Sequence, residues 1–165
     1  MAALTVMTTV GAGSIAAASQ APSPAGSRPA AIVKMVCSSE AVGKIDEILG
    51  EPAKVSDPTW VNHLYSCDYA FGGATMVLSV KELSSWSQTI GYFRSLETPL
   101  KKKMTLYGLG QGAFNTRVGS VVVRKDWKVL VVDVAALPKS LAATSTASNI
   151  GLSVAGAIML CWKGD

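Results

Sequence analysis

The chain has 165 residues, of which 49% are hydrophobic and 16% charged, and its formal net charge is +4 at pH 7. This length suits one domain with a substantial core. A single histidine and three widely spaced cysteines exclude an ordinary zinc site and any Cys-x-x-Cys redox motif.

The first 21 residues have the composition of a targeting segment. They are almost entirely apolar or small, no charged residue precedes Arg28, and small-residue triplets near the end of the segment fit a signal-peptidase site. A basic start is missing, so the segment is either a signal peptide that begins upstream or an Ala/Thr-rich tail. We expect a signal peptide over 1–21, a Pro/Ser/Ala linker over 22–34 and a single domain over 35–165.

The next segments predict a helix followed by a β-hairpin. In SSEAVGKIDEILGEP a serine can cap the helix, apolar residues recur on one face, and Gly50 ends it. The alternation in VNHLYSCDYAF is typical of a half-buried strand, with His63 on the same face as Cys67. Gly72-Gly73 then predicts a tight turn into the strand ATMVLSVK.

The second half of the chain repeats this order. SSWSQTIGYFRSL predicts a helix, Lys101–Lys103 lie in a basic loop, and GSVVVRK and WKVLVVDVA predict strands joined at Lys125-Asp126. From Pro138 we expect one long helix, with Pro138 in its first turn. Its packing face would contain Leu141, Ser145, Ser148, Leu152, Ala155, Met159 and Trp162. The order indicates an α+β fold: an antiparallel sheet of two hairpins with helices packed on one face and a long C-terminal helix.

YGLGQGAF, residues 107–114, is the one stretch that could be a phosphate-binding loop. A dinucleotide fingerprint needs a glycine where Ala113 stands and a helix after the loop, where a strand is expected here. The Gly-Lys-Ser/Thr ending of a Walker loop is absent. We therefore interpret Gly108, Gly110 and Gly112 as a structural turn that needs positive φ or close backbone approach, and we expect no cofactor.

Positive charge is concentrated between residues 94 and 128, where eight basic residues occur with only two acidic ones. The eight are Arg94, Lys101, Lys102, Lys103, Arg117, Arg124, Lys125 and Lys128. This bias favours anionic partners, but a solubilising surface has the same composition. Binding of an anion or a nucleic acid to this region is the alternative hypothesis for function, although we do not expect a nucleic acid as the partner.

The three cysteines suit a disulfide if the protein is exported. Cys37 precedes the first helix and Cys67 lies in a strand, so a bridge between them would tie helix to sheet and contribute roughly 3 kcal/mol. Cys161 is expected to be a free, packed thiol next to Trp162. Pairing of Cys161 with either of the others stays open, as does a cytosolic protein with three reduced thiols.

Five features occur in a characteristic order: a cysteine just before a helix that ends in Leu-Gly, the strand SCDYAF, the loop GLGQGAF, a hairpin and a C-terminal helix. Over residues 35–162 this order resembles small exported and lipoprotein domains of unknown function from actinobacteria, in which the loop is usually G-x-G-x-x-A followed by an aromatic residue. The resemblance implies an α+β domain outside the membrane, a Cys37–Cys67 disulfide and a sensing or ligand-binding role without catalytic residues. Two features depart from it: no lipidation signal precedes Cys37, and Cys161 is additional.

Catalytic groups are sparse. His63 is the only ordinary base, Asp133 lies within an apolar strand, and no known nucleophile motif is present. We interpret both residues as structural and expect a non-enzymatic protein. The favoured hypothesis is an exported binding or interaction domain at the cell envelope or outside the cell, whose partner is a protein, an envelope polymer or a small apolar ligand.

Overall fold

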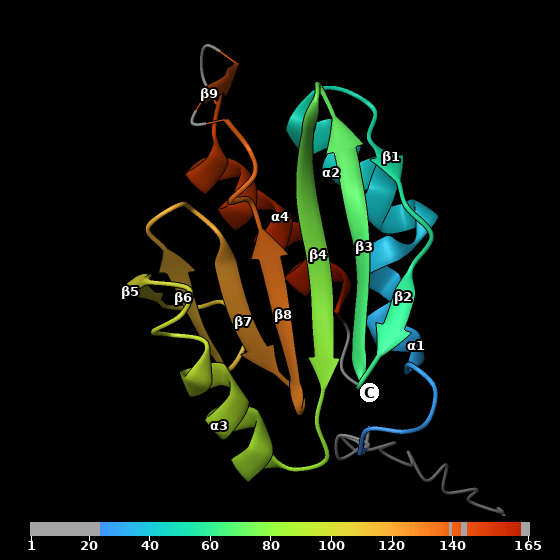
Figure 1. Ribbon diagram of the computed structural model, residues 1–165, viewed down its shortest axis with the longest axis vertical. Coiled ribbons are helices and arrows are strands. Elements are labelled where there is room, and N and C mark those ends of the chain that lie inside the picture. The colour runs from blue at the N-terminus through green and yellow to red at the C-terminus, as the bar shows by residue number, and fades with distance from the viewer. Residues whose placement is uncertain (1–23, 139, 143–144, 163–165) are drawn as a thin grey trace, which may run out of the picture.

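The computed structural model describes residues 24–138, 140–142 and 145–162. The expected signal peptide over 1–21 lies outside these residues. The described chain has an α+β fold with an antiparallel sheet and a C-terminal helix, which confirms the predicted fold class (Figure 1).

The elements follow the chain in the order α1 (Ala31–Lys34), the 3₁₀ helix η1 (Met35–Cys37), α2 (Ser39–Leu49), β1 (Lys54–Val55), β2 (Thr59–Val61), β3 (Leu64–Phe71), β4 (Ala74–Glu82), α3 (Trp86–Ser95), β5 (Lys102–Leu106), β6 (Gly112–Thr116), β7 (Val121–Lys125), β8 (Lys128–Asp133), β9 (Ser140–Ala142), β10 (Ser145–Thr146) and α4 (Ala147–Cys161). The first eight strands form one sheet, and β9 pairs with β10 in a separate hairpin.

The sheet is built around the two predicted hairpins. Its strand order is β1-β3-β4-β8-β7-β6-β5, with β2 also paired to β3, and every pairing is antiparallel. The hairpins β3–β4 and β7–β8 meet at the β4–β8 pairing, where Val77 lies opposite Asp133. The second hairpin turns at Asp126-Trp127, one residue later than predicted.

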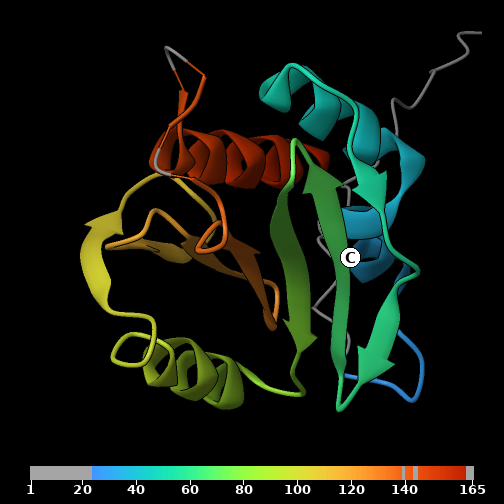
Figure 2. The ribbon, with the colours of Figure 1, turned by 45° about the horizontal axis from the view of Figure 1, so that its top comes forward.

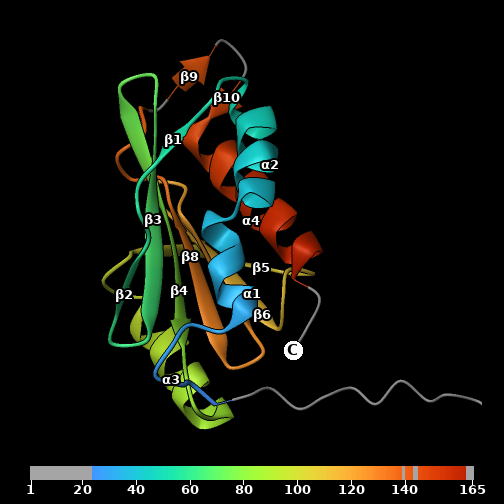
Figure 3. The same ribbon diagram turned by 90° about the vertical axis from the view of Figure 1, so that its right-hand side faces the viewer.

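The larger core lies between the sheet and α1, α2 and α4, which cover one face (Figure 3). Ile45 of α2 and Ile158 of α4 are buried there, and each such side chain contributes about 1.5–3 kcal/mol. Tyr69 of β3 is also buried, and its hydroxyl donates a 2.6 Å hydrogen bond to the carbonyl of Val36. Burial raises the pKa of Tyr69 well above its ordinary value, and the charge of Asp46 adds to this shift.

α3 packs on the opposite face, which is where the structure differs from the expectation that all helices share one face. Phe114, Val122 and Val129 form a second core cluster with Phe93 and other residues of and around α3. The reason is the run of consecutive valines in β7, which places apolar side chains on both faces of the sheet, so both must be covered. Figure 2 shows α3 and α4 on opposite sides of these strands.

The strand predicted over 61–71 contains a turn. Asn62 and His63 have φ values of 52° and 59° and connect β2 to β3. This is the two-residue hairpin geometry in which asparagine is favoured. His63 is therefore exposed in a turn, and the prediction that it shares the buried face of Cys67 was wrong. The predicted alternation holds over residues 65–71.

The segment after Pro138 is not one long helix. α4 begins at Ala147 and is capped by Thr146, whose Oγ1 accepts a 3.2 Å hydrogen bond from the amide of Asn149. Ser and Thr compete for backbone hydrogen bonds and so favour a cap and a hairpin here over a helix interior. The buried residues of α4 are Ala147, Ile150, Gly151, Val154, Ala155 and Ile158. Leu152, expected on the packing face, is 48% exposed.

The folded part of the chain extends upstream of residue 35. Val33 in α1 is fully buried, and the amide of Ala30 donates a 2.7 Å hydrogen bond to the buried Glu82 carboxylate. The segment expected to be a linker over 22–34 therefore contributes to the core at its C-terminal end.

Candidate functional site

The glycine-rich segment Tyr107–Gln111 is a turn between β5 and β6. Gly108 and Gly110 have φ values of 75° and 58°. A Cβ atom on Gly110 would lie 2.6 Å from Val123 Cγ1 and 2.8 Å from the Arg124 carbonyl oxygen. The same carbonyl accepts a 2.8 Å hydrogen bond from the amide of Gln111, which holds the turn against β7.

The third glycine of this segment serves a different purpose. Gly112 does not have positive φ, but a Cβ atom there would lie 3.0 Å from Nη2 of Arg124. That nitrogen donates a 2.5 Å hydrogen bond to the carbonyl of Gln111. A strand follows the glycines, so no helix N-terminus is presented to a phosphate group at this loop.

A groove of about 580 Å³ lies between this turn and the C-terminal part of α4. We call it the loop–helix groove. One side is lined by residues 108–111, the other by Gly156, Met159 and Leu160, and Lys125 also lines it. Leu160 is 84% exposed. Tyr107, which directly precedes the lining residue Gly108 in the chain, is 91% exposed. The groove therefore has a largely apolar lining with one positively charged residue, Lys125.

Sequence reasoning did not identify this groove. It depends on the turn lying next to the C-terminal part of α4, and these two segments are more than forty residues apart in the chain. The one available signal was the apolar pair Met159-Leu160, of which Met159 packs partly against the core whereas Leu160 is 84% exposed.

The eight basic residues of the 94–128 region do not form one patch. Lys128 is 2% exposed, lying within β8 beside Glu82 of β4. The Lys125 amine donates a hydrogen bond to the carbonyl of Trp162 at the end of α4. This interaction satisfies a carbonyl that a helix end leaves without an intrahelical partner.

Arg124 is engaged in a stack with two aromatic rings. Its guanidinium lies 4.2 Å from the ring centre of Trp86 and 5.7 Å from that of Phe93. Burial, and secondarily the charge of Arg94, lower the pKa of Arg124. Arg94 itself is exposed near the end of α3. These two arginines thus lie on the α3 side of the sheet.

The remaining four basic residues lie together around one shallow depression. It has a volume of about 650 Å³ and is lined by Glu97, Thr98, Lys101, Lys102, Lys103 and Arg117. We call it the basic depression. Lys102 forms a 2.9 Å ion pair with Glu97, and the Lys102 amine lies 5.5 Å from the ring centre of Phe114. The sequence placed these lysines in a loop, whereas Lys102 and Lys103 begin the edge strand β5.

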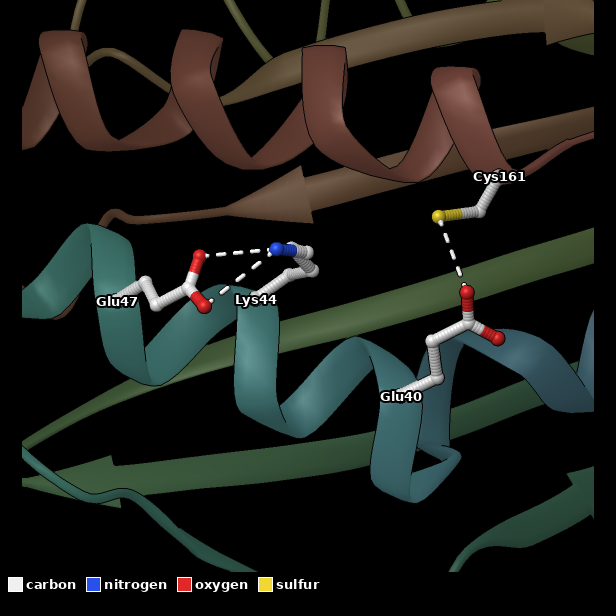
Figure 4. Close-up of polar contacts among 4 residues, drawn as sticks. All are labelled: Glu40, Lys44, Glu47 and Cys161. Carbon is white, nitrogen blue, oxygen red and sulfur yellow. Dashed lines mark hydrogen bonds and ion pairs between the residues drawn. The ribbon is translucent and has the colours of Figure 1, made fainter.

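Cys37 and Cys67 form a disulfide that joins η1 to β3. Cys161 is a free thiol at the end of α4, with its sulfur 3.9 Å from Oε1 of Glu40 (Figure 4). Lys44 and Glu47 form an ion pair on the same helix as Glu40, and the figure shows this helix, α2, running alongside α4. The thiol is partly buried, between two packed helices.

The two residues considered as catalytic groups are far apart on the sheet. Asp133 lies opposite Val77, near the start of β4, and accepts a 2.8 Å hydrogen bond from Ser120 Oγ and a 2.9 Å bond from the amide of Ala135. The carbonyl of His63 instead accepts from the amide of Glu82, at the other end of β4. Ser120 contacts Asp133 directly, but His63 is too far away to act as a general base on Ser120, which needs direct contact or one bridging water.

No protein family matches the chain, and neither a characterised protein nor a solved structure is significantly similar to it. Within the residues that the structure describes, no helix has the length and hydrophobicity needed to span a membrane. In the same ranges, no three His, Cys, Asp or Glu residues lie close enough together to bind a metal ion.

Proposed function

We propose that the protein is an exported, non-enzymatic binding domain that acts at the cell envelope or outside the cell. The observation that carries the proposal is the Cys37–Cys67 disulfide, because disulfides persist in oxidising compartments and are rare in the cytosol. The signal-like composition of residues 1–21 supports the same compartment. Kinship with small exported domains of actinobacteria is part of the proposal and rests on the order of the sequence motifs.

The proposed binding site is the loop–helix groove. Its volume of about 580 Å³ lies in the range of about 300–1,000 Å³ that is usual for small-molecule sites. Leu160 presents an apolar side chain that the fold itself leaves in solvent. Binding of an apolar ligand, or of an apolar side chain of a protein partner, would be favourable because it removes this apolar surface from water.

The groove can be tested with the fluorescent apolar probe phenylnaphthylamine on the full chain. We expect saturable binding that Leu160→Asp weakens by about tenfold or more, because an unpaired carboxylate in an apolar contact costs over about 1.4 kcal/mol. Leu152→Asp is the matched control, since Leu152 is also exposed on α4 but does not line the groove. Equal loss in the two variants, or no saturable binding to the parent protein, would refute the groove as the site.

A further inference from the structure

Three of the four cations at the basic depression lack a carboxylate partner in the described part of the chain. Lys102 is paired with Glu97, but no ion pair involves Lys101, Lys103 or Arg117. Like charges gathered in this way repel one another, and the repulsion is relieved when an anion binds among them. The depression therefore has an excess of three positive charges that the fold does not neutralise.

Main-chain hydrogen bonds join the separate segments that carry these cations. The amide of Arg117, in the turn between β6 and β7, donates a 3.2 Å hydrogen bond to the carbonyl of Lys101. The amide of Lys102 donates a 2.8 Å bond to the carbonyl of Glu97 at the end of α3. Two turns and the start of β5 are thus fixed relative to one another, so the side chains that carry the charges are attached to an ordered backbone rather than to a flexible tail.

A buried hydroxyl without a protein partner in the described ranges lies next to the depression. An adjoining cavity of about 180 Å³ shares Lys101 and Arg117 with it and is also lined by Thr116. Thr116 is 2% exposed, and its Oγ1 has no hydrogen-bond partner among the described residues. Buried polar groups are normally hydrogen-bonded to protein or to an ordered water molecule. Asp133 also lines this cavity, so an anion would remain in the outer, basic part.

The lining of the depression indicates which kind of anion fits. It contains no aromatic side chain on which a base could stack. Lys and Arg both bind phosphate oxygens, and Arg does so in a two-pronged geometry. Being shallow, the site suits a stretch of a chain that passes across it.

We propose that the basic depression binds the phosphodiester backbone of an anionic polymer, through Lys101, Lys102, Lys103 and Arg117. The inference goes beyond the proposed function and is independent of it, because it concerns a different surface and requires no particular compartment. Neutral envelope polymers would not bind at this site. Recognition through backbone charge alone also predicts that affinity falls steeply with added salt.

The test uses a labelled oligomer of abasic deoxyribose phosphate, a phosphodiester chain without bases, and the full-length protein. The variant is Lys103→Gln/Arg117→Gln, which spares the Lys102–Glu97 pair and Lys101, whose φ is 54°. The matched control, Lys34→Gln/Lys54→Gln, removes the same charge from exposed sites in α1 and β1. We expect binding to weaken roughly 10-fold or more in the variant only, with the slope of log affinity against log salt reduced by about 2.

Three outcomes would overturn the proposal. Equal weakening in variant and control would mean that net charge alone attracts the oligomer. Binding of an oligothymidylate of the same length more than about tenfold tighter than the abasic chain would mean that bases are read. Binding to phosphatidylglycerol vesicles without binding to the free oligomer would identify a membrane surface as the partner. Failure of the proposed export or of the groove would leave all of these measurements unaffected.

Discussion

The two glycines of the Tyr107–Gln111 turn provide a matched test of why the turn contains glycine. Both have positive φ, so alanine at either position pays the penalty of a left-handed backbone. They differ in surroundings, because a Cβ atom on Gly108 would meet nothing within 4 Å. One on Gly110 would overlap with Val123 and with the main chain of Arg124.

The expected costs follow from this difference. Gly108→Ala should lower the free energy of unfolding by about 1–2 kcal/mol, the penalty for a left-handed residue with a side chain. Gly110→Ala should add a steric term of about 1–3 kcal/mol, since the Arg124 carbonyl belongs to a central hairpin and cannot move aside freely. We therefore expect a total of about 2–5 kcal/mol for Gly110→Ala.

Urea unfolding followed by circular dichroism measures both values, and an unchanged m value would show that the variants can be compared. A difference of less than about 0.5 kcal/mol between Gly108→Ala and Gly110→Ala would refute the account of close packing at Gly110. If neither variant is destabilised, the turn does not require glycine, and a ligand-binding role for these residues would have to be reconsidered.

Three further variants test the packing of the sheet. Replacing Cys37 and Cys67 by alanine should lower the free energy of unfolding by about 3–4 kcal/mol in urea, because the bridge joins residues 30 positions apart; a loss below about 1 kcal/mol would contradict this. Burial raises the pKa of Tyr69 above its ordinary value of 10.0, so its contribution to stability is complete below about pH 10 and is lost as the pH rises further. Urea unfolding across this range should show a decline of about 1.4 kcal/mol per pH unit that Tyr69→Phe removes, and an unchanged slope would count against it. Arg124→Lys should lower Tm by about 2–4 °C through loss of the stack on Trp86, whereas an unchanged Tm in a thermal melt would mean that the stack contributes nothing.

The elements with a complete local signal were predictable from the sequence. Ser38 caps α2 through a 3.3 Å bond from the amide of Ala41, and Gly50 ends the helix with a φ of 75°. Ser85 caps α3 in the same way. In each case the cap, the apolar periodicity and the terminating residue indicate one structure.

The elements that depend on the rest of the fold were missed. β5 is an edge strand whose central residues are exposed, so its sequence lacks the apolar alternation that reveals a strand. His63 lies in a turn because Asn62 readily adopts positive φ. The apolar alternation on either side of Asn62 indicated a continuous strand instead. The loop–helix groove could not be predicted, because it depends on where α4 packs relative to the β5–β6 turn. The four cations of the basic depression were among the eight named from the sequence, but their separation from the other four depends on the pairing of β5 with β6.

Export and the disulfide are tested together by the intact mass of the protein recovered from cell fractions of its native host, measured with and without reduction and alkylation. We expect an extracytoplasmic protein that begins near residues 19–22, with Cys37 and Cys67 protected until reduced and Cys161 alkylated without reduction. A cytosolic protein that retains residues 1–21 and has three alkylatable thiols would contradict this expectation. The basic depression would then be the first surface on which to look for a partner.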